Sequence, residues 1–416
     1  MGGVSMEWKE VTLGDFMQCN PKRTIKKGQK ARKITMDLLI PHSKTIRNWN
    51  YEPYSGGAKF QNGDTIMARI TPCLENGKHA FVSILDKGEI AYGSTEYFVF
   101  CGKEDVSDND FVYYLTKTPL FRDTAVKSMV GSSGRQRAQM DVLENLKMLV
   151  PKDISDQRRI ASILSSLDRK IELNNKINAD LEEMAQAIFK NWFVDFEPFK
   201  DGKFVDSELG MIPEGWKVGK ITDIGCLITD YVSNGSFASL KQNVHLYETK
   251  EYAQFIRNTD LKTNTFSVYV DKHSYDFLSK STLYGNEIII SNVGDVGSVH
   301  LCPKLDIPMT LGNNIIMLRP NEKEYNYFLY LWFKYFSGQG LIQGIKGGSA
   351  QPKFNKTDFK NLPLLIPSFE IIEKSYWIFE SMFSILSSNV KESSRLSLLR
   401  DTLLPRLMSG EIEIPE

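Results

Sequence analysis

Apolar residues recur at alternating steps of four and three along residues 155–193, a stretch without glycine or proline. This spacing puts them on one face of a helix and is typical of the a and d positions of a coiled coil. Ser155 is expected to cap the helix, and about 36 helical residues would extend about 54 Å. The face comprises Ile160, Leu164, Leu167, Ile171, Asn174, Asn178, Leu181, Ala185 and Ile188.

Two polar residues interrupt this face near its middle. A buried asparagine in a coiled coil costs stability but fixes register and partner. Asn174 and Asn178 can equally lie at the edge of the seam and be partly solvated. The spacing alone leaves both interpretations open.

A second long helix is expected from about Ile371 to Leu407. Phe379, Phe383, Leu386 and Val390 keep the steps of four, three and four, and Leu396, Leu399 and Leu403 follow in a shifted phase. Each helix is the obvious partner of the other. An antiparallel coiled coil within the chain would relate the two halves by a pseudo-twofold axis and make one chain resemble a symmetric dimer.

The rest of the chain repeats itself. The segment GSSGRQRAQMDVLENLKMLVP at 131–151 matches GGSAQPKFNKTDFKNLPLLIP at 347–367 without a gap. Two further pairs of segments are similar. The first pair is NGDTIMARI at 62–70 and YGNEIIISN at 284–292, and the second is YGSTEYFVF at 92–100 and LGNNIIMLRP at 311–320. Such strand-like runs separated by Gly/Asn turns predict a mixed domain, present twice.

The expected fold is therefore α/β, in the mixed α+β sense, with two tandem globular domains and two long helices. We assign the first domain to residues 1–154 and its helix to 155–197. The second domain, with an N-terminal linker, spans 198–370, and its helix spans 371–416. Trp8-Lys9 and Trp216-Lys217 precede similar strands, so each half begins alike.

Composition narrows the class of protein. The 416 residues are 42% hydrophobic and 25% charged with a formal net charge of +0, which is ordinary for a globular protein. The five cysteines form no CxxC pair, and the five histidines have no metal-ligand spacing, so no metal site is expected. Neither a signal peptide nor a membrane span is predicted, and a cytoplasmic protein is expected.

Two similar globular domains held at a fixed separation would suit double-stranded DNA that contains two half-sites. The basic run KRTIKKGQKARK at 22–33 suits phosphate, although it can also be a solvated loop. Arginine suits guanine and glutamine suits adenine, although a residue of this kind is more often a turn residue or a surface charge than a base contact. The DNA-binding candidates are Lys22, Arg23, Lys26, Lys27, Arg69, Ser133, Arg135, Gln136, Arg137, Asn292, Asn313, Asn314, Ser349, Gln351 and Lys353.

Several motifs resemble one family, the specificity (S) subunits of Type I restriction–modification systems. They are ARITPCLENGK (68–78), GSSGRQRAQMDVLENLKMLVPKDISDQRRIASIL (131–164), AIFKNWFVDFEPF (187–199), ELGMIPEGW (208–216) and LLRDTLLPRLMSGEIEI (398–414). The resemblance covers essentially the whole chain. Asp156-Gln157 stands where the family usually shows Glu-Gln, and Ile372-Glu373 departs from the pair at the second helix.

The resemblance implies a role without catalysis. Each globular domain would be a target recognition domain for one half of a bipartite DNA sequence. The helices would set the spacing and dock two modification (M) subunits, which carry S-adenosylmethionine and methylate adenine. Restriction (R) subunits, using ATP and magnesium, would join for cleavage. Candidates for helix pairing and M-subunit docking are Ile160, Leu164, Leu167, Ile171, Asn174, Asn178, Leu181, Phe379, Phe383, Leu386 and Val390.

Two other hypotheses remain. A self-contained nuclease would use Asp230, Glu248 and Lys250, an acid followed by Glu-x-Lys, although one such match in a chain of this length is close to chance. A protein-binding scaffold would use the helix pair and show no salt-dependent affinity for DNA.

Overall fold

The computed structural model describes residues 6–348, 350–412 and 414. The chain divides into two compact units. Unit 1 comprises Met1–Lys176 with Asn389–Glu416, and unit 2 comprises Ile177–Ser388. Two helices of 40 residues each run from one unit into the other, α5 (Ile154–Phe193) and α12 (Phe369–Met408).

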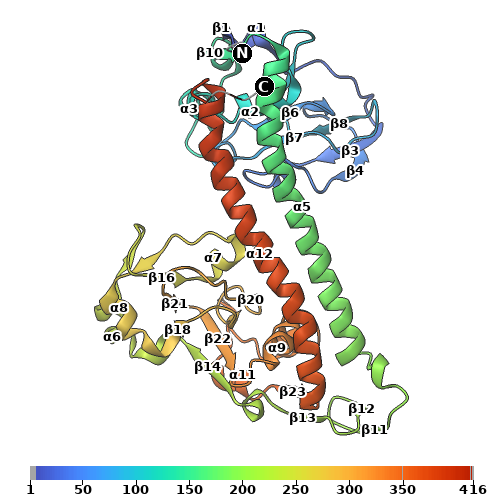
Figure 1. The fold of residues 1–416 in the computed structure, drawn as a ribbon, viewed down its shortest axis with the longest axis vertical. Coiled ribbons are helices and arrows are strands. Elements are labelled where there is room, and N and C mark those ends of the chain that lie inside the picture. The colour runs from blue at the N-terminus through green and yellow to red at the C-terminus, as the bar shows by residue number, and fades with distance from the viewer. Residues whose placement is uncertain (1–5, 349, 413, 415–416) are drawn as a thin grey trace, which may run out of the picture. The chain divides into compact units, whose positions relative to one another are not determined.

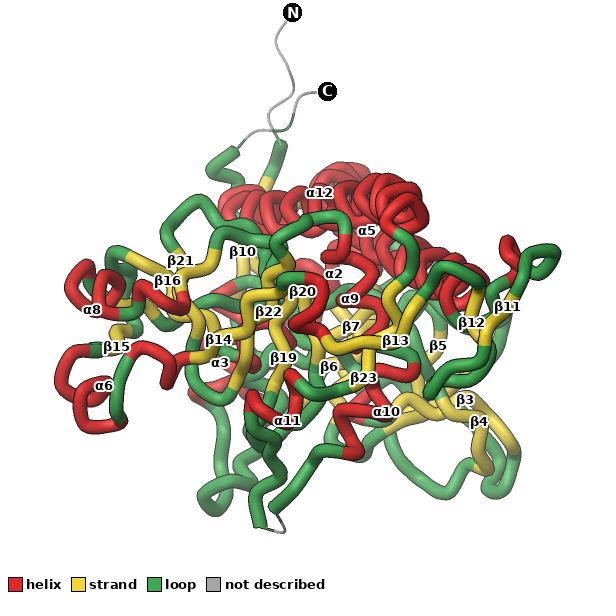
Figure 2. The backbone as a smooth tube through the Cα atoms, turned by 90° about the horizontal axis from the view of Figure 1, so that it is seen from below, coloured by secondary structure: helices red, strands yellow, loops and turns green. Residues whose placement is uncertain are grey.

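Unit 1 contains two four-stranded sheets, ordered β2-β9-β6-β7 and β4-β3-β8-β5, and a two-stranded sheet of β1 and β10. The strands are short and joined by long loops (Figure 2). Its elements besides the long helices are β1 (Trp8–Thr12), α1 (Leu13–Phe16), β2 (Met17–Cys19), β3 (Lys30–Ile34), β4 (Asn50–Pro53), β5 (Lys59–Gln61), β6 (Thr65–Ala68), β7 (His79–Phe81), β8 (Ile90–Gly93), β9 (Tyr97–Gly102), α2 (Asn109–Leu115), α3 (Pro119–Lys127), α4 (Met140–Glu144) and β10 (Lys147–Pro151).

Unit 2 repeats this plan with a four-stranded sheet, β14-β22-β19-β20, and a five-stranded sheet, β15-β17-β16-β21-β18. Two-stranded sheets join β11 to β12 and β13 to β23. Its elements are β11 (Phe204–Val205), β12 (Ile212–Pro213), β13 (Lys217–Lys220), β14 (Cys226–Asp230), α6 (Phe237–Asn243), β15 (Leu246–Tyr247), β16 (Ala253–Ile256), α7 (Asn258–Thr263), β17 (Tyr269–Val270), α8 (Lys272–Phe277), β18 (Thr282–Leu283), β19 (Ile288–Ser291), β20 (Val299–Leu301), β21 (Met309–Leu311), β22 (Ile315–Pro320), α9 (Tyr325–Lys334), α10 (Ser337–Gly344), α11 (Lys356–Lys360) and β23 (Pro363–Ile366).

The mixed fold and the duplication are confirmed. In each unit one strand of the second sheet runs parallel to its neighbour, β3 beside β8 and β16 beside β21, among otherwise antiparallel pairs. Gly93 ends strand β8, and Gly312 directly follows the equivalent strand β21. A Cβ atom on either glycine would collide with a carbonyl oxygen of the parallel neighbour, at Ile34 or Ile256, so both positions require the missing side chain.

The two similar beginnings of the halves have a common structural reason. β1 pairs antiparallel with β10, with Trp8 opposite Pro151, and β13 pairs in the same way with β23, with Lys217 opposite Ile366. Each starting strand therefore closes its unit against the strand that leads into a long helix. Trp8 and Trp216 both pack at the end of a long helix, Trp8 beside Gly410 and Trp216 beside Phe193.

The long helices lie side by side within each unit (Figure 1). In unit 1 the contacts show that the two helical segments run in opposite directions. Arg159 donates to the backbone oxygen of Ile414, Arg400 donates to Asp168, and Asn174 donates to Glu392. This order establishes the antiparallel pairing. The predicted cap at Ser155 is wrong, because α5 already begins at Ile154 and Ser155 lies in its first turn.

In the pair Asp156-Gln157 at the start of α5, Gln157 anchors the helix to the globular domain. Its side chain is buried and accepts from the backbone of Asp108, 2.9 Å, while its amide donates to the oxygens of Val106 and Pro151. By the offset of the repeat the counterpart of Gln157 in α12 is Glu373, which is exposed, and its neighbour Ile372 is fully buried in the apolar core of unit 2. The polar anchor of Gln157 is therefore absent from the second helix, which still forms.

No helix among the described residues is long and apolar enough to cross a lipid bilayer.

Candidate nucleic-acid interface

In unit 1 the loop between α3 and α4 folds back onto the end of strand β6. Arg137 forms isolated bridges with Ile70 and Val130. We call the backbone of residues 69–71, 96 and 136–138 the strand-end frame of unit 1. Its hydrogen bonds run from Ala138 N to Arg69 O, 2.8 Å, from Thr71 N to Gln136 O, 3.0 Å, and from Arg69 N to Glu96 O, 3.0 Å.

The side chains of this frame form one charged cluster. Arg137 makes a bidentate pair with Glu96 through Nε and Nη2, at 3.0 and 2.7 Å, and Arg69 Nε donates to the same carboxylate at 3.1 Å. The hydrogen bonds from Arg137 lower the pKa of Glu96 in spite of its partial burial, and Arg69 adds to the effect. The cluster carries two cations and one anion. The guanidinium of Arg69 lies over the ring of Phe98, 5.6 Å from its centroid, and its terminal amino groups have no hydrogen-bond acceptor among the described residues.

Unit 2 builds the same frame from different residues. Lys353 forms isolated bridges with Val293 and Gly347. Each bond of the first frame has its counterpart: from Phe354 N to Asn292 O, 3.0 Å, from Gly294 N to Pro352 O, 2.8 Å, and from Asn292 N to Asn314 O, 3.1 Å.

The frame pairs the candidate positions of the two halves. Arg69 corresponds to Asn292, Glu96 to Asn314 and Arg137 to Lys353. The strand before it is shifted by one residue relative to an ungapped alignment of 62–70 with 284–292, which would pair Arg69 with Ser291. Backbone geometry is thus retained while the side chains change from an arginine–glutamate cluster to amides and a lysine.

The remaining candidates near the frames differ in exposure. Ser133 and Arg135 are exposed and Gln136 is half-buried, whereas Asn313, Asn314 and Gln351 are exposed. Asn314 holds a left-handed backbone with φ of 63°, a conformation that asparagine tolerates better than most residues. Ser349 lies outside the described residues.

The basic run precedes and enters strand β3. Lys22, Lys26 and Lys27 are exposed. Arg23 is instead held by Asp64, with its Nη2 2.8 Å from a carboxylate that is 1% exposed. The structure therefore joins Arg23 to the protein interior and leaves the three lysines in solvent.

In unit 1 the seam residues of α5 pack against the end of α12. Ile160 and Leu164 are buried with Leu404, Leu407 and Met408, whereas Leu167, Ile171 and Val390 are half-buried. Asn174 is fully buried, and its amide donates to Glu392 at 2.8 Å and to Ser393 at 3.3 Å. Of the two interpretations left open by the sequence, Asn174 follows the buried one.

In unit 2 the seam joins the globular core. Phe379 is fully buried, and Phe383 stacks on Tyr327 of α9 with ring centroids 4.9 Å apart. Leu181 and Leu386 pack against the same cluster, and Asn178 is half-buried and donates to the oxygen of Leu386. The seam thus holds the helices to the domain as well as to each other, and the buried rings of Phe379 and Phe383 are not available to another protein.

Of the three residues in the nuclease hypothesis, Asp230 has a structural role and the other two are exposed. Asp230 accepts from the backbone and side chain of Ser233 and pairs with Lys356 at 2.8 Å. Glu248 and Lys250 are exposed. Within the part of the chain that the structure describes, no three His, Cys, Asp or Glu side chains gather as a metal would require.

Comparison with known proteins identifies this repeated architecture. A family model described as the Type I restriction modification DNA specificity domain matches residues 6–183 and again residues 213–394. The chain belongs to the Type I restriction–modification specificity family. The duplication within this specificity subunit therefore corresponds to two copies of the family domain, each with its strand-end frame.

Relatives of the same description span the chain. The specificity subunit of the Type I restriction enzyme HindI from Haemophilus influenzae is 26% identical and covers 98% of this chain and 100% of its own. The MjaIX specificity subunit of Methanocaldococcus jannaschii is 29% identical over 74% of this chain and 70% of its own. A crystal structure of the Type I S subunit from M. genitalium has a TM-score of 0.56 at 16% identity, covering 99% of this chain and 97% of that one, which is a likeness of fold.

Reasoning from the sequence missed Glu96 and the buried pair of Asp168 and Arg400. Glu96 lies in a turn between strands, where a single acid has no distinguishing signal. Asp168 and Arg400 lie at helix positions outside the apolar seam, and only the pairing of two helices 232 residues apart brings them together.

Proposed function

We propose that this specificity subunit reads a bipartite sequence in double-stranded DNA, with one half-site read by the strand-end frame of each unit. The observation that carries the proposal is that one backbone frame occurs twice with different side chains. A DNA-binding frame that occurs twice with the same backbone and different side chains suits two half-sites of different sequence.

The side chains of the first frame suit guanine. Arg69 uses Nε for Glu96, so the fork of its two terminal amino groups is free to meet O6 and N7 in the major groove. Arg137 uses Nε and Nη2 for Glu96 and acts as a positioning residue for the loop. Ser133, Arg135 and Gln136 at the loop add contacts to phosphate or base edges.

The second frame suits a different half-site. Asn313 is exposed next to the frame, and an amide pairs with N6 and N7 of adenine. Asn292 and Asn314 shape the frame, Gln351 and Lys353 belong to its loop, and Ser349 is a further candidate for a DNA contact. Lys353 is exposed and makes no ion pair among the described residues, which suits a phosphate.

The exposed lysines of the basic run, Lys22, Lys26 and Lys27, contact phosphate in this proposal, whereas Arg23 supports the fold. Phosphate contacts position the protein and make affinity depend steeply on salt. The chain itself has no catalytic role. It acts in the cytoplasm of a bacterium or archaeon.

The helix pair sets the separation of the half-sites and docks two M subunits in this proposal, with R subunits joining for cleavage. S-adenosylmethionine acts in the M subunit, and ATP and magnesium act in the R subunit. Because only part of the seam is buried, docking uses its half-buried side chains together with exposed apolar residues of the same helices. The exposed residues are Leu173, Leu398 and Leu399 in unit 1 and Met184, Trp377 and Ile385 in unit 2, each at least 45% exposed.

Methylation sequencing of host DNA tests the proposal. A host carrying this chain with its M subunit is compared with hosts carrying Arg69→Ala or Asn313→Ala. We expect a bipartite methyladenine motif that degenerates in one half with Arg69→Ala and in the other half with Asn313→Ala. Loss of both halves with either variant, or a motif that persists without the chain, would contradict two separate readers.

A further inference from the structure

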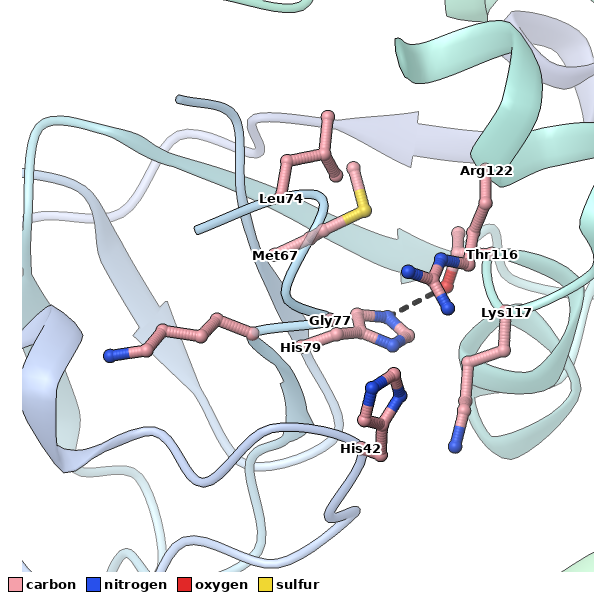
Figure 3. Close-up of a pocket in the computed structure, with 9 residues that line it drawn as sticks. His42, Met67, Leu74, Gly77, His79, Thr116, Lys117 and Arg122 are labelled. Atoms are coloured by element: carbon pink, nitrogen blue, oxygen red, sulfur yellow. Dashed lines mark hydrogen bonds between the residues drawn. The ribbon is translucent and has the colours of Figure 1, made fainter. Parts of the chain in front are cut away.

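A small cavity in unit 1 lies where strand β7 meets the junction of α2 and α3. Figure 3 shows His42, His79, Lys117 and Arg122 turned toward it from three separate segments. Its volume is about 10 Å³, which suits one particle of about the size of water. The donors around it have no part in the DNA-reading proposal.

Lys117 is the unusual member of this group. Its Nζ is shielded from solvent and has no hydrogen-bond partner among the described residues. It lies 5.5 Å from the ring centroid of Tyr113, which offsets only part of the cost of burial. Burial, followed by the charge of Arg400, lowers the pKa of Lys117 to about 8.

The neighbouring groups add donors and positive charge. His79 is buried, stacks on Tyr113 with ring centroids 4.8 Å apart and shares a hydrogen bond of 2.9 Å with Thr116. Burial lowers the pKa values of His42 and His79, and the charges of Lys117 and Arg122 lower them further. A site with several donors and mutually repelling cations favours an anion.

The nearest carboxylates do not satisfy Lys117. Asp168 and Asp401 act on its charge, but both accept from Arg400, at 2.6 and 2.9 Å, and the second oxygen of Asp168 accepts from Tyr114. Arg122 donates a long hydrogen bond of 3.4 Å to the backbone oxygen of Glu75 and is otherwise without an acceptor among the described residues.

We propose that this cavity binds a single halide-sized inorganic anion through Lys117 Nζ, with Arg122 and His42 completing its shell. The volume leaves room for a single small ion. The bound ion compensates the buried ammonium and ties the junction of α2 and α3 to the loop that carries His42. The site is independent of the proposed reading of DNA.

Two measurements on the full-length chain test the site. Crystals soaked in bromide should show an anomalous peak beside Lys117 Nζ. Hydrogen exchange at residues 109–127 should slow when chloride replaces gluconate at constant ionic strength. If chloride half-saturates the site at about 10 mM, 100 mM chloride would slow exchange about tenfold.

Lys117→Met should keep the fold, because it replaces an unpaired buried charge with an apolar chain of similar length, and should abolish the chloride response. Lys127→Met removes an exposed charge from the end of α3 and should retain it. Arg122→Gln should weaken the response severalfold. An equal chloride response in Lys117→Met, or bromide peaks only at other places on the surface, would overturn the proposal.

Discussion

The buried ion pair between the long helices offers a strong test of how unit 1 is held together. Arg400 Nη1 lies 2.6 Å from Asp168 Oδ1, and both side chains are 7% exposed. The second oxygen of Asp168 accepts from Tyr114 OH of α2 at 2.6 Å. One network therefore joins α5, α12 and the globular domain.

Arg400→Met should cost about 3–4 kcal/mol of stability in unit 1. Removing one partner of a buried pair usually costs about 3–5 kcal/mol, because the other charge stays buried. Here Tyr114 keeps one hydrogen bond to Asp168, which places the expectation below the upper end of that range. The double variant with Asp168→Leu should recover much of the loss, since neither member of the pair is then left buried without the other.

Hydrogen exchange of the helix segments 154–176 and 389–408 measures this change locally, which avoids assuming that the whole chain unfolds in one step. Arg395→Met, at an exposed position of the same helix, is the matched control. A loss no greater than that of Arg395→Met would refute the assigned role of the pair.

Three further changes separate reading, docking and stability. Glu96→Gln should release Arg69 and lower discrimination at one half-site by about tenfold or more, with total affinity for nonspecific DNA unchanged or raised; competition binding with altered half-sites measures this. Trp377→Ala, at a side chain 57% exposed, should weaken co-purification of the M subunit at least about tenfold while changing stability by less than about 0.5 kcal/mol, and unchanged co-purification would exclude this docking face. Burial, followed by the charge of Lys334, lowers the pKa of His300 to about 4. Between pH about 6.5 and 4 the unfolded chain binds up to one proton more at this residue than the folded chain, so unit 2 should lose stability as the pH falls. His300→Gln should flatten that part of a curve of stability against pH, and an unchanged curve would argue against this role.

The periodic parts of the fold were predictable because local spacing determines them. The steps of four and three located both long helices, and the 216-residue repeat revealed the duplicated domain before any geometry was known. The strand-like runs at 62–70, 92–100, 284–292 and 311–320 each contain all or most of a strand of the structure, since Gly/Asn turns mark them.

Non-local contacts account for what the sequence did not predict. Whether Asn174 is buried depends on Glu392 and Ser393, which lie more than 200 residues away along the chain. The one-residue shift between β6 and β19 arises in turns of unequal length, which an ungapped comparison cannot register. Arg23 looked like any other cation in its basic run, and only the fold brings Asp64 to it.

The division of the chain has a consequence for the order of its synthesis. Residues 389–408 complete unit 1, yet they follow all of unit 2 along the chain. During translation Ile160 and Leu164 must therefore wait for Leu404 and Leu407 until the later unit has been made. A ribosome that stops before residue 389 would release a first unit with an uncovered apolar stripe, so such truncated chains should be chaperone clients or aggregate rather than act as half-readers.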